Sequence, residues 1–524
     1  MNTSDRRSLN IEDKGHAFDN WEINLHSSTQ FEVLVDYLLD PDIVEARFNV
    51  ELYFFIPSSF RINKDTYTKH DFYQDMQAYI RFIPKLITLS NVINESNEIS
   101  PLVVANSLLD EIFKGDSSTV LTERIVHELK MLANVVRTYM RKEVQTICSS
   151  ILSVDIPRQV MNDVISNTIK LTQDIRKFHN VLSEIRPRYL SSVTPLTVRE
   201  TYEFTTEYIS LNLQRELTKL LNHVKFVSST HRQFEDIIDL IKQSIKYERD
   251  FRIQYSYPSI LIQGGENESF AYRHSILKKF TSNVLYLTAR PVSQTRAIQE
   301  IGYAAAAGFA MLVALLITFY AQEEFGPYTL PFVVVVVIGY MIKDRLKEWG
   351  RFLTKFGAKR NTFDYKSKIR DREENIIGYS QESFRFIDYD KVPSDVLQLR
   401  SLSALTAIEE EGKPQDVIRY IKIVRLLPKQ ISDAHVRVLN TSDIIRFDIS
   451  SFLSKIENPY EKRLWYNVET NDLEYFTLSR EYHLNLILKF VSSDNSRREE
   501  CHIDRVRLIL DKNGIKRIEA GEKL

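Results

Sequence analysis

The stretch that decides the fold is Ile301–Ile342, which reads IGYAAAAGFAMLVALLITFYA, then QEE, then FGPYTLPFVVVVVIGYMI. The first apolar segment, Ile301–Ala321, has no ionisable group except tyrosine. As a helix rising about 1.5 Å per residue, it can cross a hydrocarbon core of about 30 Å. The second segment, Phe325–Ile342, is marginal in length. Together they predict a transmembrane hairpin over residues 297–342, and the alternative is a buried hairpin inside a large soluble domain.

The second segment contains a valine run, Val333–Val337, and two prolines near its start, Pro327 and Pro331. Proline is accepted in the first turn of a helix, where its missing N–H would have had no partner. A valine run in water is typical of a buried strand, but a lone strand in lipid would leave its backbone N–H and C=O groups without partners. We therefore expect a second helix that pairs with the first.

Basic residues flank the hairpin on both sides, whereas the turn between its segments holds only acids. Before the hairpin these residues are Lys278, Lys279, Arg290 and Arg296, and after it they are Lys343, Arg345, Lys347, Arg351, Lys355, Lys359 and Arg360. Cytoplasmic flanks of membrane spans are enriched in Lys and Arg. The polar residues 1–20 lack the apolar core of a signal peptide. The sequence therefore predicts a two-span protein of the cell membrane, a bacterial inner membrane, with both termini cytoplasmic.

Composition bounds the class of protein. The chain has 524 residues, 43% of them hydrophobic, which is enough to fill the cores of more than one domain. The 69 basic and 70 acidic side chains nearly cancel, so no global basic field attracts phosphates, and we expect no nucleic-acid partner. Cys148 and Cys501 are far apart in sequence and give no disulfide framework, as expected in a reducing compartment.

The part before the hairpin is predicted to change from mixed structure to helices. A polar tail covers residues 1–17, and a mixed α/β region covers residues 18–100. In that region Phe48–Phe54 alternates apolar and polar residues, as in a strand with one buried face, and Asp65–Phe82 is predicted to be a helix. Over residues 101–296 apolar side chains recur at spacings of three and four, so we expect a cytosolic α-helical bundle.

The part after the hairpin has the alternation of β-strands. Apolar residues alternate with polar ones at residues 445–449, 464–468, 484–490 and 506–510. Asn513-Gly514 is typical of a hairpin turn, because glycine accepts positive φ at no steric cost. We expect a cytosolic, β-rich, sandwich-like domain over residues 363–524. The predicted fold class is a multidomain α+β membrane protein, with a mixed α/β region and an α-helical bundle before a central two-helix transmembrane hairpin.

The sequence contains no motif that identifies a reaction. A glycine-rich phosphate loop with its lysine, a Gly-x-Ser-x-Gly elbow and a kinase-type loop are all absent from it. Glu203 and Glu207 could act together as an acid–base pair, but such spacing is common on solvated helix faces. His502 and Asp504 would share one face of a strand and Cys501 the other, so these three do not converge. We expect no catalytic residue, no metal ligand and no cofactor.

Residues 343–362 are predicted to form a basic amphipathic helix beside the membrane. Lys343, Lys347, Arg351 and Lys355 recur every four residues, and Trp349 lies on the apolar stripe. In one alternative the helix lies on the membrane surface, with Trp349 at headgroup level and the cations near anionic lipid headgroups. In the other, it continues straight from the second span and packs its apolar stripe against the carboxyl-terminal domain. The sequence supports the two equally.

Small side chains lie one turn apart in the first span, Gly302 with Ala306 and Ala304 with Gly308. Small residues let helix backbones approach closely. We expect the partner to be the second span of the same chain, and the alternative is another copy. Neither span carries a charged or amide side chain in its middle, so a hydrophilic pore built from them is not expected.

The expected function is a non-catalytic interaction, scaffold or regulatory role that holds cytosolic domains at the membrane. The reasons are two sizeable cytosolic parts, a minimal external loop and the lack of a recognisable reactive motif. The expected partners are the lipid bilayer with its anionic headgroups, and a protein partner or a second copy of the chain. The alternatives are a membrane-tethered enzyme with a site assembled from distant residues, and an oligomeric channel or membrane effector.

Overall fold

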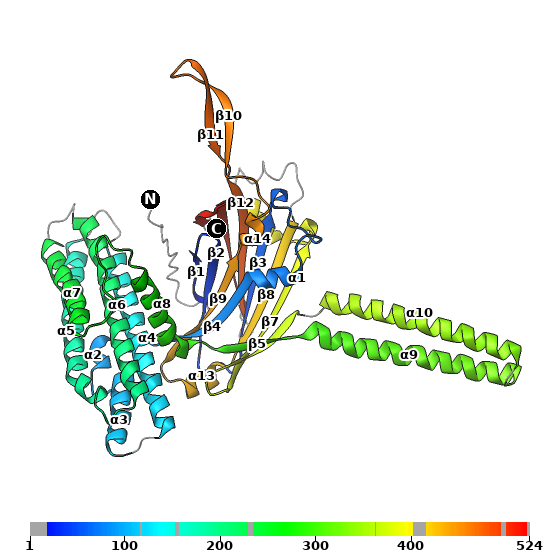
Figure 1. Cartoon of the computed structure of the whole chain (residues 1–524), viewed down its shortest axis with the longest axis horizontal. Helices are drawn as coiled ribbons and strands as arrows, with labels where there is room; N and C mark the ends of the chain where they lie inside the picture. The colour runs from blue at the N-terminus through cyan, green and yellow to red at the C-terminus, as the bar shows by residue number, and fades with distance from the viewer. Residues whose placement is uncertain are drawn as a thin grey trace. The chain divides into compact units, whose positions relative to one another are not determined.

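The computed structural model describes residues 18–115, 118–151, 157–228, 234–327, 329–361, 363–401, 416–493 and 499–520. The chain is a mixed helix-and-sheet multidomain protein with a β-rich carboxyl-terminal region. It divides into two compact units (Figure 1). The first unit combines Met1–Ile80, Leu287–Ile431 and Ser442–Leu524, and the second combines Arg81–Tyr286 and Ser432–Thr441.

The first unit is built on an eight-stranded sheet in the order β14-β13-β12-β3-β8-β7-β6-β5. Its strands are β3 (Ala46–Ile56), β5 (Thr288–Ser293), β6 (Tyr365–Arg370), β7 (Ile376–Ile387), β8 (Asp416–Leu426), β12 (Tyr482–Ser493), β13 (Glu499–Asp511) and β14 (Gly514–Ala520). Strand β3 pairs antiparallel with β8 and β12, so that Leu52 lies opposite Tyr420 on one side and Leu488 on the other. A strand from the amino-terminal part thus lies at the centre of a sheet made mostly from the carboxyl-terminal part.

A second, four-stranded sheet has the order β1-β2-β9-β4. Its strands are β1 (Phe18–Leu25), β2 (Gln30–Tyr37), β4 (Met76–Pro84) and β9 (Val438–Asp448). Aromatic rings join the two sheets: Tyr37 of β2 stacks on Phe48 of β3 with centroids 4.4 Å apart, and Trp21 of β1 lies 5.8 Å from Phe490 of β12. Such pairs bury large apolar areas. Two sheets packed face to face make a sandwich-like core.

The other face of the large sheet is covered by helix α11 (Ser394–Ser401). Val396 and Leu399 of this helix form one buried cluster with Tyr53 and Phe55 of β3. Strand β3 therefore has packing partners on both of its faces. This explains why every residue of its segment Val50–Ile56 is buried, although alternation alone predicts one buried face.

Two expectations from the sequence differ from the structure. Residues 18–100 and 363–524 were expected to form separate regions, but their strands share one sheet. Alternation shows which face of a strand is buried, and it does not show which strand lies beside it. The helix expected over Asp65–Phe82 is wrong in its second half: α1 (Lys69–Asp75) ends at β4, where Met76, Ile80 and Phe82 are buried.

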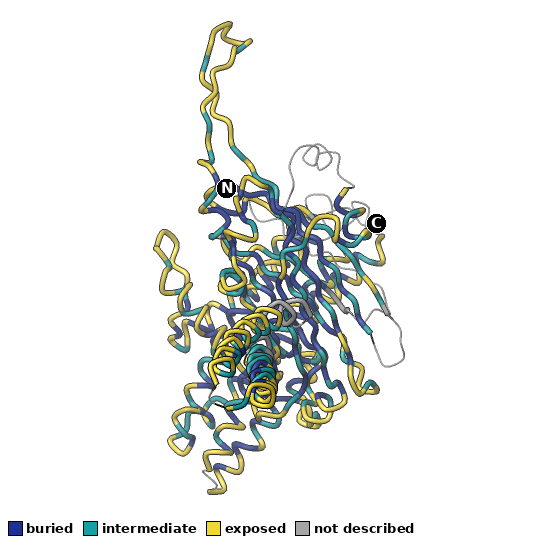
Figure 2. The backbone as a smooth tube through the Cα atoms, turned by 90° about the vertical axis from the view of Figure 1, so that its right-hand side faces the viewer, coloured by how far each residue is buried: buried dark blue, intermediate teal, exposed yellow. Residues whose placement is uncertain are grey.

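Strands β10 (Tyr460–Asn467) and β11 (Asp472–Ser479) form a separate two-stranded ribbon, paired from Tyr460 opposite Ser479 to Asn467 opposite Asp472. Most of this ribbon is exposed or half-buried (Figure 2). The alternation at residues 464–468 therefore marks a real strand, but neither of its faces is buried in the chain.

The second unit is mainly helical. Its longer helices are α3 (Pro101–Phe113), α4 (Thr119–Ser149), α5 (Arg158–Tyr189), α6 (Leu196–Ser228), α7 (Glu235–Gln254) and α8 (Glu268–Ser282). Helix α6 packs against both α4 and α7. Serine residues cap the amino-terminal ends of α3 and α4. The Ser100 hydroxyl accepts a hydrogen bond from the N–H of Val103, and the Ser118 hydroxyl accepts one from the N–H of Leu121.

Candidate membrane-contacting hairpin

The apolar stretch forms a pair of helices that are connected to two paired strands. Helix α9 (Gln294–Phe325) follows β5 directly, and α10 (Leu330–Asn361) leads into β6. Strands β5 and β6 pair antiparallel, with Ser293 opposite Tyr365 at the helix ends. The two helices run side by side along their length (Figure 1). They form an antiparallel helical hairpin whose two ends are held at one edge of the large sheet.

Among the described helices, one segment, Gln299–Phe325 of α9, is long and apolar enough to cross a membrane by length and composition. Only 17% of its most apolar window is buried. The second apolar segment is shorter as a helix than the sequence suggested. Phe325 ends α9, α10 begins at Leu330, and charged residues begin at Lys343.

Small residues bring the two helices close together. A Cβ atom added to Gly302 would lie 2.0 Å from the Cγ2 of Thr354, and one added to Gly350 would lie 2.5 Å from the Cβ of Ala306. Contacts this short leave no room for a larger side chain. Gly302 and Ala306, expected to contact a helix, therefore lie against α10 of the same chain.

The other two small residues point elsewhere. Ala304 is exposed, and a Cβ added to Gly308 would meet no described atom within 4 Å. The four residues singled out in the sequence thus divide into a pair that faces α10 and a pair on the outer surface of the hairpin.

The contacts between α9 and α10 share one antiparallel register. Gly302 lies beside Thr354, Ala306 beside Gly350, and Ile317 beside Gly339. Each step forward on α9 therefore matches an equal step back on α10. The same face of α9 continues through three buried alanines, Ala310, Ala314 and Ala321. This register places Lys343 of α10 at the level of Val313 of α9.

The outer surface of the hairpin carries large apolar side chains. Figure 2 shows it mostly exposed or half-buried. The exposed residues include Phe309, Met311, Leu312, Leu315, Leu316, Phe319 and Tyr320 on α9, and Leu330, Val333, Val334, Val337, Ile338, Tyr340, Met341 and Ile342 on α10. Large exposed apolar surfaces are typical of sites that bind a partner or a membrane.

The predicted basic residues follow this surface on α10. The Lys343 ammonium lies 4.3 Å from the centroid of the Tyr340 ring and 3.8 Å from an oxygen of Asp344. The Arg351 guanidinium lies 5.9 Å from the Tyr303 ring. Lys347 is half-buried. Lys355 lies in α10, and its side chain is outside the described part of the structure.

Helix α10 is continuous from Leu330 to Asn361. Its backbone therefore follows the alternative in which the basic helix continues straight from the apolar segment. The packing against the carboxyl-terminal domain in that alternative is not seen at Trp349 or Leu353, each of which is more than 60% exposed. The straight helix thus leaves part of its apolar stripe uncovered by the chain.

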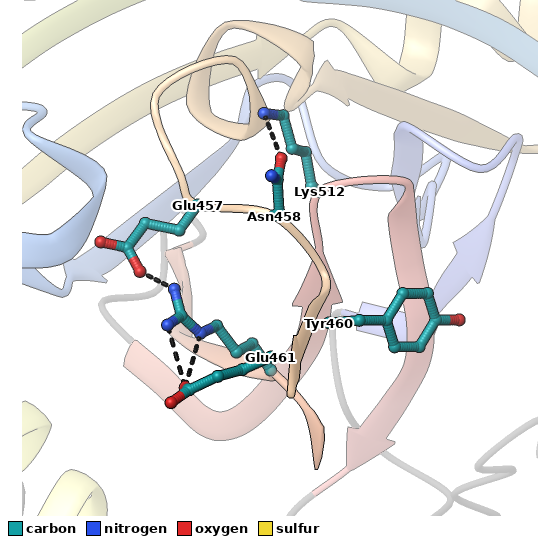
Figure 3. A pocket seen from close by; sticks show the side chains of 6 residues that line it. Glu457, Asn458, Tyr460, Glu461 and Lys512 are labelled. Carbon is teal, nitrogen blue, oxygen red and sulfur yellow. Dashed lines mark hydrogen bonds and ion pairs between the residues drawn. The ribbon is translucent and has the colours of Figure 1, made fainter. Parts of the chain in front are cut away.

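An open pocket of about 420 Å³ lies at the base of the β10–β11 ribbon, lined by Glu457, Asn458, Tyr460, Glu461, Arg480 and Lys512 (Figure 3). The Arg480 guanidinium binds Glu461 at 2.9 Å and also pairs with Glu457. Lys512 donates to the Asn458 amide oxygen at 3.1 Å. Because the pocket's cations are already bound to its own acceptors, we assign it no ligand.

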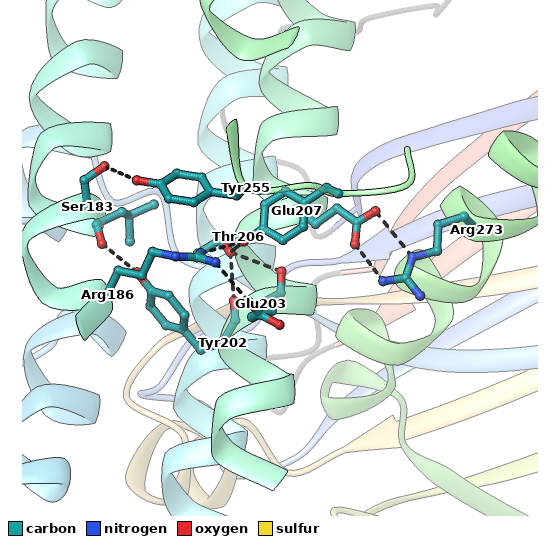
Figure 4. Close-up of polar contacts among 10 residues, drawn as sticks. Ser183, Arg186, Tyr202, Glu203, Thr206, Glu207, Tyr255 and Arg273 are labelled. Atoms are coloured by element: carbon teal, nitrogen blue, oxygen red, sulfur yellow. Dashed lines mark hydrogen bonds and ion pairs between the residues drawn. The ribbon is translucent and has the colours of Figure 1, made fainter. Parts of the chain in front are cut away.

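The two carboxylates considered as a possible acid–base pair bind different arginines. Glu203 accepts from Arg186 at 2.9 Å, whereas Glu207 is buried and binds Arg273 at 2.8 Å (Figure 4). Arg186 also donates to the Tyr257 hydroxyl at 2.8 Å. Each carboxylate therefore has its own arginine, and these contacts tie α5, α6 and α8 together. His502 does pair with Asp504, while Cys501 is exposed.

A buried polar cluster lies between the two sheets of the first unit. The Lys422 ammonium on β8 donates to Asp443 on β9 at 2.7 Å, and both side chains are at most 2% exposed. The Tyr37 hydroxyl donates to the second oxygen of Asp443 at 2.9 Å. Glu382 on β7 lies opposite Lys422 across the sheet. Burial raises the pKa of the Glu382 carboxyl, although Lys422 opposes this shift.

We expect Glu382→Gln to change how stability depends on pH. Because the pKa of Glu382 is raised in the folded chain, its stabilising contribution is present below the ordinary glutamate pKa of about 4.3 and is lost as pH rises through the folded pKa. Glutamine copies the neutral form at every pH. In detergent, the midpoint temperature of thermal unfolding of the variant should therefore increase relative to that of the unmodified chain as pH rises. A constant or falling difference would contradict this assignment.

Among the described residues, no group of three or more His, Cys, Asp or Glu side chains is arranged to hold a metal ion. No protein-family model, curated protein or solved structure matches the chain. Neither Lys422 nor Asp443 was predicted from the sequence to be buried. Asp443 lies two residues before Ile445 and four before Phe447, and this shared strand face is the signal that could have placed it inside.

Proposed function

We propose that this chain is an integral membrane protein in which the α9–α10 hairpin crosses a bilayer as two spans and holds the two units on its cytoplasmic side. The observation that carries the proposal is the apolar outer surface of the hairpin, on which residues such as Leu316 and Val337 are more than half exposed. In water such a surface is costly, and lipid acyl chains remove that cost.

The route of the chain supports one common side for both units. The strands at the two ends of the hairpin are paired with each other, so both helices begin and end near one sheet edge. The basic residues from Lys343 to Arg351 lie between that edge and the apolar part of α10. Positive charge at this end favours a cytoplasmic location.

The role that fits best is a non-catalytic interaction, scaffold or regulatory protein. Charged groups that could have served chemistry are held in structural ion pairs, such as Lys422 with Asp443 and Arg273 with Glu207. The partners are then the bilayer with its anionic headgroups, and a protein bound by the cytosolic units.

Topology reporters fused at Asn2, inserted at Glu323, and fused at Leu524 test this arrangement. Only the reporter at Glu323, in the last helical turn of α9, should signal from outside, because both helices lead back to the β5–β6 pair. The reporters at Asn2 and Leu524 serve as internal controls and should signal from the cytoplasm. A cytoplasmic signal at Glu323 would overturn the two-span proposal.

A further inference from the structure

The length of the apolar band on the hairpin follows from the helix register. On α10 the uncharged helical segment runs from Leu330 to Ile342 and is followed at once by Lys343. Its length is about 20 Å at about 1.5 Å per residue. The register places Lys343 beside Val313, and the apolar part of α9 ends at Ala321, before Gln322, Glu323 and Glu324. The apolar band shared by both helices therefore runs from Val313 to Ala321 on α9 and is about 13 Å long, whereas an ordinary hydrocarbon core is about 30 Å thick.

The side chains of α9 change character within about one turn of this level. Apart from Ile301 and Phe325, its exposed large apolar residues lie between Phe309 and Tyr320. Before them the sequence is small, with four consecutive alanines, Ala304–Ala307, between Tyr303 and Gly308. Alongside this part, residues 348–353 of α10 combine apolar side chains with the charged residues Glu348 and Arg351. The uninterrupted apolar surface shared by the two helices therefore ends near Lys343.

The charged groups above this level cannot all avoid lipid in a thick bilayer. The Asp344 and Glu348 side chains are 74% and 66% exposed on the outer surface of α10. Lysine and arginine reach several ångströms toward the headgroups, but the short aspartate side chain cannot. A thicker hydrocarbon core would therefore bury Asp344. A hydrophobic stretch shorter than the bilayer is accommodated by thinning or by a choice of thinner membrane.

We infer that the hairpin is matched to a thin bilayer, and that the charged residues Lys343, Asp344 and Arg345 set the limit of its insertion. This inference rests on the proposed function. It deepens that function by naming the lipid property to which the hairpin responds, namely the thickness of the hydrocarbon core.

The test uses the full chain in a competition between vesicles. Vesicles of myristoleoyl, oleoyl and erucoyl phosphatidylcholine, each with the same fraction of phosphatidylglycerol, carry different fluorescent labels and are separated after flotation. We expect the unmodified chain to favour the myristoleoyl over the erucoyl vesicles by about ten-fold or more. The triple variant Lys343→Leu, Asp344→Leu, Arg345→Leu extends the apolar band by about one turn and should lower this ratio.

A matched control removes the same kinds of charge elsewhere. Lys225→Leu, Asp239→Leu, Lys242→Leu changes three exposed residues of α6 and α7 and should keep the preference of the unmodified chain. Equal binding to all three vesicle types, or an unchanged ratio in the Lys343 variant, would overturn the inference while leaving the membrane proposal standing. No binding to any vesicle would overturn the proposed function itself.

Discussion

Replacing Leu316 and Val337 together by arginine should release the chain from membranes. Both side chains lie on the outer surface of the hairpin, 60% and 53% exposed, within the apolar band. An arginine at the centre of a membrane helix costs about 2.5–3.5 kcal/mol, so two cost about 5 kcal/mol or more, equivalent to over a thousand-fold in partitioning. Flotation with vesicles should find the unmodified chain at the top of the gradient and this variant at the bottom.

The matched control for this experiment is Val120→Arg, Leu196→Arg. These residues are 67% and 60% exposed on α4 and α6 of the helical unit, so the chemical change and the exposure are similar. The control variant should float like the unmodified chain. Continued flotation of the Leu316 and Val337 variant would show that the apolar face of the hairpin does not contact lipid.

Replacing Asp443 by alanine should destabilise the first unit by about 3–5 kcal/mol. The substitution leaves the Lys422 ammonium buried without its carboxylate and removes the acceptor of the Tyr37 hydroxyl. A buried charge without a partner is costly, because the interior does not replace its hydration. Trp21 is buried between the same sheets. Its fluorescence during denaturant unfolding in detergent can therefore report the loss of stability.

Two further variants separate the buried charge from a general packing defect. Lys422→Met with Asp443→Asn removes both charges and keeps an acceptor for Tyr37, so it should recover most of the lost stability. Glu374→Gln breaks an exposed pair with Arg370 and should change stability by less than about 1 kcal/mol. If Asp443→Ala lowered the free energy of unfolding by no more than Glu374→Gln does, the buried ion pair would not stabilise the first unit as we propose.

Local sequence patterns predicted the strands that have one buried face and the long helices that have a repeated apolar stripe. Alternation located β3, β9, β12 and β13, and the spacing of three and four located the long helices, because each pattern records which side chains meet the core. The turn at Asn513-Gly514 is confirmed: β13 and β14 form a hairpin there, and Gly514 has a φ of 145°.

These local patterns could not predict which strands pair with one another over long sequence distances. Nothing near Leu52 in sequence shows that it lies between Tyr420 and Leu488, because backbone hydrogen bonds between strands are the same for any sequence. For a similar reason the sequence does not distinguish Gly302 and Ala306 from Ala304 and Gly308 as helix-contact residues. Only the register of α9 on α10 separates the two pairs.

The hairpin shows the same division between local and long-range information. Its apolar character can be predicted from the sequence of Ile301–Ile342. The offset between its two apolar segments cannot be, because it depends on where the turn between Phe325 and Leu330 places one helix against the other. Because of that offset, the two apolar segments overlap over a shared band of only about 13 Å.

The most direct test of the central claim is flotation of the unmodified full chain with vesicles of phosphatidylcholine and phosphatidylglycerol, followed by alkaline carbonate extraction of the floated fraction. We expect the chain to float with the lipid and to stay with it at alkaline pH, because the exposed surface of α9 and α10 would lie among acyl chains. A folded chain that stays at the bottom of the gradient, or that carbonate removes completely, would contradict the claim.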